Sequence, residues 1–121
     1  MKLPVFSLIP STLILILLLL PNLSPAQDVS FIWTASPEPV VGYKLYYETG
    51  TATAPPYDGK GLAQGDSPID LGNVTTFTLS GLSPDQTYRF VLTTYSKTRE
   101  SSYSSVVTVE PSPAIKRIYI N

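Results

Sequence analysis

Gly81-Leu82-Ser83-Pro84-Asp85-Gln86-Thr87-Tyr88 is the stretch of sequence that decides the fold of this chain. Polar and apolar residues alternate before it, at residues 76–79, and after it, at residues 88–92, as is typical of half-buried β-strands. A glycine and a proline punctuate the segment between them, which indicates a turn. Leu82 is placed to enter a core beneath this turn, and the hydroxyl of Tyr88 can bond back to the backbone of the turn. The stretch therefore predicts two strands joined by a clamped turn.

Further segments of the chain have the character of short strands. On the first, at residues 29–33, alternation directs Trp33 inward as the largest core residue. On the second, at residues 41–47, alternation directs Val41 and Tyr43 inward and the intervening side chains outward. Short strands are also predicted at residues 67–71, 88–95 and 104–109.

Three features point to one family: the turn that ends at Tyr88, the single tryptophan, and the run Gly42-Tyr43-Lys44-Leu45-Tyr46-Tyr47. With them the chain resembles a fibronectin type III domain over residues 28–110. The turn and its tyrosine match the tyrosine corner of such domains. The resemblance implies an all-β fold of the immunoglobulin-like type, with two packed sheets. It also implies four structural residues, namely Trp33, Tyr43, Leu82 and Tyr88.

The first 26 residues are predicted to be a secretory signal peptide. Lys2 precedes an unbroken run of leucine and isoleucine at residues 13–20, and Ser24-Pro25-Ala26 then offers the small residues that signal peptidase recognises. Cleavage after the alanine would leave a domain at residues 27–110 and a tail at residues 111–121. The product would be secreted or would lie in the periplasm or cell envelope. An uncleaved membrane anchor is the alternative, although the apolar run is shorter than the roughly 20 residues of a spanning helix.

The composition of the chain argues against several kinds of chemistry. Its 121 residues carry a formal net charge of −1 and no basic stripe, so nucleic acid is not an expected partner. Cysteine and histidine are both absent, which removes thiolate metal sites, disulfides and the usual general base. We expect no cofactor, no metal and no catalytic activity. A concave site that holds two carboxylates would revive the enzyme hypothesis.

The sequence departs from the family at the start of the domain. Only Gln27 separates the predicted cleavage point from Asp28, so the first strand of the family should be missing or very short. One sheet would then contain only the strands at residues 29–33 and 76–80, and the edge of the former would be unpaired. The isoleucine-rich tail at residues 114–121 is expected to be extended, and could fold back along an open sheet edge.

The resemblance implies a binding module that contacts a protein or a polysaccharide. The signal peptide predicts that no membrane span remains after cleavage. The alternatives are a structural subunit of a surface assembly and an accessory protein of carbohydrate-active enzymes. We predict a contact surface on the outer face of the sheet, with Tyr46 and Tyr95 as anchors beside Lys44, Val91 and Thr93. The competing interpretation is that tyrosine and valine are simply good strand formers on a half-exposed surface.

A long irregular segment at residues 49–66 is the next candidate if that face is not the site. It holds a pair of prolines and several glycines, with no sustained alternation. A solvated loop is the favoured interpretation, and an ion site the alternative.

Overall fold

The computed structural model describes residues 26–111 and 116–120. Within these residues no helix is long and apolar enough to cross a membrane. The predicted signal peptide lies outside the described part of the chain, apart from Ala26. The strands in the described residues are β1 (Gln27–Trp33), β2 (Gly42–Thr49), β3 (Ile69–Gly72), β4 (Thr76–Leu82), β5 (Tyr88–Tyr95), β6 (Val107–Val109) and β7 (Lys116–Ile120).

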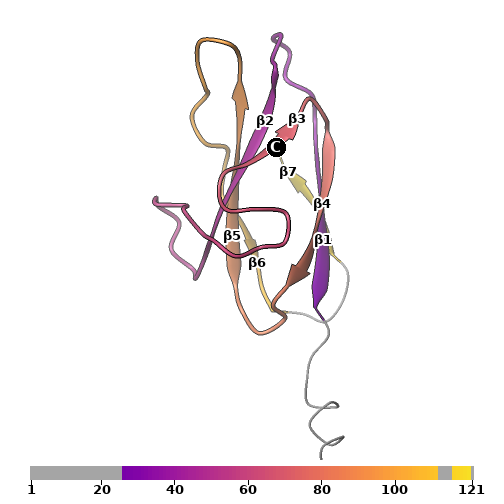
Figure 1. The fold of residues 1–121 in the computed structure, drawn as a ribbon, viewed down its shortest axis with the longest axis vertical. Coiled ribbons are helices and arrows are strands. Elements are labelled where there is room, and N and C mark those ends of the chain that lie inside the picture. Colours follow the sequence, from indigo (N-terminus) through magenta and orange to yellow (C-terminus); the bar gives the residue numbers. More distant parts are fainter. Residues whose placement is uncertain (1–25, 112–115, 121) are drawn as a thin grey trace, which may run out of the picture.

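The strands form two sheets that pack face to face as the layers of a sandwich (Figure 1). One sheet has the strand order β4-β1-β7, and the other has the order β3-β2-β5-β6. Phe31 of the first sheet and Phe90 of the second meet edge to face in the core, with ring centroids 4.8 Å apart. The predicted all-β, two-sheet fold is confirmed.

Alternation along β1 and β2 places the core between the sheets. Phe31 and Trp33 are buried, and Ile32 between them is partly exposed, as the sequence predicted. Tyr43 is also buried, and its ring centroid lies 5.4 Å from that of Trp33. Val41 is 47% exposed, so its predicted inward position is wrong. It precedes the first residue of β2, where the alternation of the ladder does not yet fix the direction of a side chain.

The turn between β4 and β5 is clamped as the sequence predicted. Leu82 is fully buried beneath it, and Tyr88 is buried as well. The backbone N–H of Ser83 donates a hydrogen bond to the hydroxyl of Tyr88, at 3.0 Å. Gly81 has a φ of 77°, in the left-handed region that glycine adopts without steric cost. Since β4 and β5 belong to different sheets, the clamp fixes the crossing from one layer to the other.

The tail supplies a third strand to the smaller sheet. β7 pairs in parallel with β1, from Val29 opposite Lys116 to Trp33 opposite Ile120. The predicted extended tail is thus confirmed for residues 116–120, whereas the predicted sheet of two strands is wrong. Pairing satisfies the backbone edge of β1, and it also buries Ile120 in the same core cluster as Trp33.

Candidate functional site

The outer face of the four-stranded sheet carries the residues that the sequence selected for partner binding. In the antiparallel ladder between β2 and β5, Lys44 lies opposite Thr93, and Tyr46 lies opposite Val91. Tyr95 is the last residue of β5 and shares this face with them. The register therefore brings the five selected residues together.

Two of these residues are not available at the surface. Val91 is 1% exposed and Thr93 is 2% exposed, so the prediction that they form an open patch with the tyrosines is wrong. The cover comes from side chains outside the strands. Thr93 donates its hydroxyl to Glu100 at 2.7 Å. On either side of Val91, Tyr57 packs on Arg89 and Tyr103 packs on Tyr46. The rings of Tyr57 and Tyr103 also contact each other.

Serine side chains hold the segment after β5 against the sheet. The backbone N–H of Ser101 donates to the carbonyl of Thr94, and that of Ser104 donates to the carbonyl of Leu92, both at 2.9 Å. In return, each serine Oγ accepts a hydrogen bond from the N–H of the same partner, at 2.9 Å. The hydroxyls thus stand in for carbonyl acceptors of a ladder. This pairing places Tyr103 over the sheet, against Tyr46.

Arg89 anchors the long loop to the same face. It is buried, and its guanidinium donates to the carbonyl oxygens of Ala54 at 2.7 Å and Pro56 at 3.2 Å. Its guanidinium carbon lies 4.8 Å from the ring centroid of Tyr57. The loop predicted at residues 49–66 is confirmed for residues 50–66, which add no strand to either sheet, whereas Thr49 is the last residue of β2. The prediction of a solvated loop is wrong for Tyr57, because that side chain is buried.

Glu100 is the polar centre of the face. Its Oε2 accepts hydrogen bonds from the hydroxyls of Tyr46 at 2.5 Å and Thr93 at 2.7 Å. Lys44 Nζ lies 3.6 Å from its Oε1. The bond from Tyr46 is the main cause that lowers the pKa of Glu100. Burial, followed by the bond to Glu100, raises the pKa of Tyr46, so the carboxylate is ionised and the phenol is protonated at neutral pH.

Tyr95 and Asp70 form a second pair of the same kind at one end of the sheet. The hydroxyl of Tyr95 lies 2.8 Å from each carboxylate oxygen of Asp70. This bond lowers the pKa of Asp70 and raises that of Tyr95. Gly42 gives the ring its room, because a Cβ there would lie 3.0 Å from the Tyr95 hydroxyl and 2.9 Å from the carbonyl carbon of Gly72.

The most exposed ring on this face is that of Tyr103, which no motif in the sequence marked. Its ring packs against Tyr46, with centroids 5.2 Å apart, and against Tyr57, with centroids 5.3 Å apart. We call these three residues the tyrosine cluster. Tyr103 is 42% exposed, and beside it lies a shallow hollow of about 320 Å³, lined by Tyr46, Glu100, Ser101, Ser102 and Tyr103. Alternation could not find Tyr103, because it lies between strands; a lone tyrosine among serines was the available signal.

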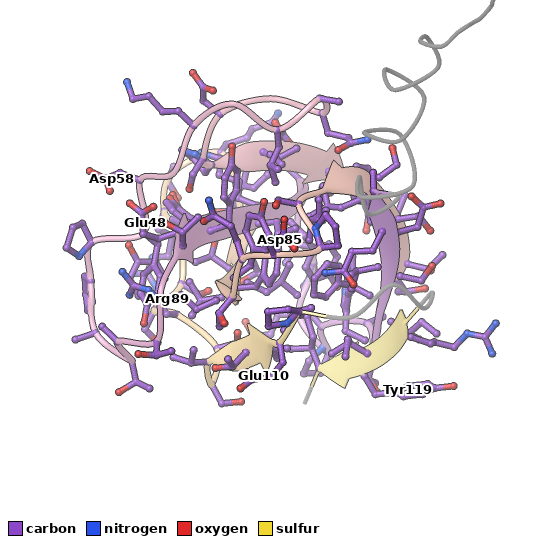
Figure 2. The ribbon with its side chains drawn as sticks, turned by 90° about the horizontal axis from the view of Figure 1, so that it is seen from below. Glu48, Asp58, Asp85, Arg89, Glu110 and Tyr119 are labelled. Atoms are coloured by element: carbon purple, nitrogen blue, oxygen red, sulfur yellow. The ribbon has the colours of Figure 1, made fainter. Side chains whose placement is uncertain are left out.

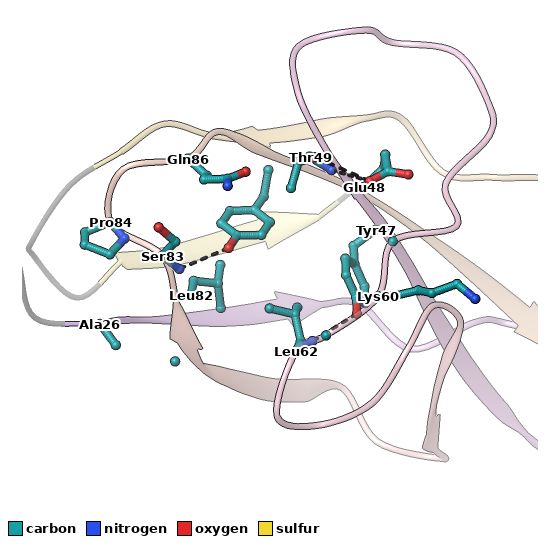
Figure 3. Close-up of a pocket in the computed structure, with 14 residues that line it drawn as sticks. Ala26, Tyr47, Glu48, Thr49, Lys60, Leu62, Leu82, Ser83, Pro84 and Gln86 are labelled. Atoms are coloured by element: carbon teal, nitrogen blue, oxygen red, sulfur yellow. Dashed lines mark hydrogen bonds between the residues drawn. The ribbon is translucent and has the colours of Figure 1, made fainter.

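A larger hollow, of about 460 Å³, lies between the long loop and the β4–β5 turn (Figure 3). The hydroxyl of Tyr47 stands in its wall, where it donates to the carbonyl of Gly65 at 2.8 Å and accepts from the N–H of Leu62 at 3.3 Å. Both bonds hold the loop in place. The polar group of this ring is therefore engaged in the fold.

One hollow brings two carboxylates together, the arrangement that would favour an enzyme. It measures about 410 Å³ and is lined by Glu38 and Glu100 among other residues. A pair of carboxyl groups that acts by general acid catalysis needs one member with a raised pKa. The pKa of Glu100 is lowered instead. Among the described residues, no group of three or more acidic, histidine or cysteine side chains is placed to hold a metal ion.

Comparison with known proteins gave one family. The sequence model of the fibronectin type III domain matches residues 21–110. A search among curated proteins found no match.

Proposed function

Because the chain belongs to the fibronectin type III family, we propose that it is an exported, non-catalytic module that binds a polysaccharide on the outer face of its four-stranded sheet. The observation that carries this proposal is the tyrosine cluster. The exposed ring of Tyr103 is held by two other rings beside an ionised carboxylate, in a hollow that is open to solvent.

The chemistry beside Tyr103 suits a sugar. A tyrosine ring offers an apolar surface to the C–H groups of a pyranose. The carboxylate of Glu100 is a strong acceptor for sugar hydroxyls, and serine hydroxyls stand next to it in the lining. Because the cluster already fixes the ring, binding costs little side-chain entropy. A shallow hollow of this size fits part of a chain laid across the surface.

Two carboxylates of this face, those of Glu100 and Asp70, support a role without catalysis. The pKa values of Glu100 and Asp70 are both lowered, so both groups are ionised acceptors at neutral pH. Neither is a proton donor for a leaving group. Domains of this architecture host many functions, so the argument rests on the site and uses the family only as a guide.

Export is part of the proposal and rests on the sequence. The apolar run at residues 13–20 and the small residues before Gln27 have the form of a cleavable signal peptide.

The alternative of a structural subunit depends on an open edge of β1. β7 pairs with that edge, which weakens this alternative.

The test is binding of purified protein to soluble polysaccharides by affinity electrophoresis, and to insoluble ones by sedimentation. Tyr103→Ser should weaken retention about fivefold or more, because a central aromatic contact contributes more than about 1 kcal/mol. Tyr119→Ser is the matched control, since Tyr119 is 67% exposed on the other sheet and points away from the sandwich (Figure 2). It should bind as the unaltered protein does.

Tyr103 is a cleaner target than the tyrosines that the sequence selected. Tyr46 and Tyr95 both bond carboxylates, so their removal also disturbs the fold. Thermal midpoints must show that each variant is folded. Unchanged retention of Tyr103→Ser would exclude the site. The unaltered protein could instead retain no polysaccharide and capture a protein in a way that depends on Tyr103. That result would show that the proposed ligand class is wrong and that the proposed binding face is right.

A further inference from the structure

Gln27, the first residue of β1, buries a primary amide without partners. It is 1% exposed, and alternation along β1 directs it between the sheets. Its backbone lies opposite Leu82 of β4, which is fully buried. Neither the Nε2 nor the Oε1 of Gln27 has a hydrogen-bond partner in the described structure, and both are shielded from solvent. A buried amide in this state opposes folding, because its lost hydration is not replaced.

We propose that Gln27 is the N-terminal residue of the mature protein and that it is converted there to pyroglutamate. The inference rests on the export proposed above, because Gln27 becomes N-terminal only if the signal peptide is cut after Ala26. The structure adds a reason why cyclisation suits this position. The residue that becomes N-terminal after the cut is one whose side-chain amide is buried without hydrogen-bond partners.

The reaction needs no second reactant. The free α-amino nitrogen of Gln27 attacks Cδ of its own side chain, and a C–N bond closes a five-membered lactam. The bond between Cδ and Nε2 breaks, and Nε2 leaves as ammonia with a proton from the attacking amine. No oxidant or reductant takes part. The carbonyl of Gln27 is untouched and continues the strand.

Cyclisation removes polar groups that the site does not satisfy. Before it, the mature chain would carry an ammonium group on the first residue of β1 and would bury the unpartnered primary amide of that residue. The lactam has one N–H and one carbonyl and carries no charge. A buried polar group without a hydrogen-bond partner costs free energy, and the lactam has fewer donors than the open form. The neutral ring therefore fits beside Leu82 better than the open form does.

The experiment uses the full precursor, expressed in a bacterial host with a general secretory pathway and recovered from outside the cytoplasm. Intact mass and tandem mass spectrometry of the first peptide define the N-terminus. We expect the chain to begin at residue 27, with a mass lower than that of the open form by one ammonia molecule. An amine-reactive label should modify lysines but not the N-terminus.

Gln27→Asn is the matched control. It keeps an amide and the same cleavage bond, but it is one methylene shorter, so its lactam would be a strained four-membered ring. Its mass should be that of the open form. A chain that begins at Gln27 with a free amine would overturn cyclisation and leave export standing. A chain that begins elsewhere would overturn both the cut and the cyclisation, while the polysaccharide assay would still stand as a test of the tyrosine cluster.

Discussion

Single tyrosine hydroxyls fix the junctions between the segments of this domain. Each ring lies in or on a sheet, and each hydroxyl reaches a polar partner where another segment passes. This use follows from the two natures of the side chain, an apolar body and a polar tip. The chain has no cysteine, so no disulfide shares this task. The five residues are Tyr43, Tyr46, Tyr47, Tyr88 and Tyr95.

Tyr88→Phe tests the clamp at the β4–β5 turn. The substitution removes the acceptor of the Ser83 N–H and changes little else. We expect the free energy of unfolding to fall by about 1 kcal/mol, and by more if the N–H stays buried. Urea denaturation measures this change through the midpoint. An unmoved midpoint would show that the hydrogen bond is not part of the stability of the corner.

At the scale of elements, two irregular segments and one strand bond to polar groups that the antiparallel ladders leave without partners. The long loop lies over the outer face because the guanidinium of Arg89 binds its carbonyls. The segment after β5 runs along β5 because its serine hydroxyls accept hydrogen bonds from the N–H groups of that strand. β7 covers the edge of β1. In each case a segment from a distant part of the chain, or one without strand pattern, satisfies polar groups of a neighbour.

Arg89→Lys tests the loop anchor. Lysine keeps the charge but is a point donor without a planar fork, so it cannot bond both carbonyls and pack on Tyr57 as arginine does. We expect a loss of about 1.5–3 kcal/mol in unfolding free energy. Amide hydrogen exchange should accelerate at Ala54 and Tyr57, since the two prolines between them have no N–H. Arg117→Lys on the exposed side of β7 is the control and should stay within about 0.5 kcal/mol. Unchanged exchange in the loop would contradict the anchor.

Ile120→Ala tests whether β7 belongs to the core. Ile120 is buried with Trp33 in one cluster, so its truncation should cost about 2–5 kcal/mol in unfolding free energy. Tyr119→Ala on the same strand removes an exposed ring and should change stability by less than about 0.5 kcal/mol. Urea midpoints of the two variants decide the matter. Equal midpoints would mean that β7 does not hold to β1 in solution.

The whole molecule covers its own surfaces with its own segments. The tail pairs with the free sheet edge, and loops from both sides of β5 cover most of the outer face. What remains exposed among large apolar or aromatic side chains in the described residues is Val41, Val74, Tyr103 and Tyr119. Of these, Tyr103 alone belongs to the tyrosine cluster. The candidate site is therefore narrow, and a single substitution can test it.

The stability of the whole domain should depend on pH mainly on the acid side. The chain has no histidine, so no side chain has an ordinary pKa between about pH 5 and 8. The folded pKa of Asp70 is lowered from 3.8 and that of Glu100 from 4.5. A lowered folded pKa means that the unfolded chain binds protons first as pH falls. This stabilisation is complete above about pH 5 and is lost as pH falls through 4.5 and below.

The measurement is the thermal midpoint between pH 7 and pH 2.5. An Asp70→Asn, Glu100→Gln double variant should be less stable at pH 7 and should lose less on acidification. If the acid limb of this variant has the same slope as that of the unaltered protein, other carboxyl groups govern the acid unfolding.

The sequence by itself determined the strands at residues 29–33, 76–80 and 88–95, the two layers and the clamp between them. Alternation of period two assigns the residues of a strand to one of two faces, and this works from neighbours in the chain alone. For the same reason, Trp33 and Tyr88 could be placed in the core before any contact was known. The five residues proposed for binding were also assigned to one face correctly.

Only the tertiary structure decided which faces are covered. Arg89 and Val91 point outward from their strand, yet both are buried, because Tyr57 of the long loop and Tyr103 of the segment after β5 lie over that face. The pairing of β7 with β1 has the same origin. Local alternation says which way a side chain points. Whether that side chain is then covered depends on which other segments pack over it. These contacts join residues that share no periodic pattern in the sequence.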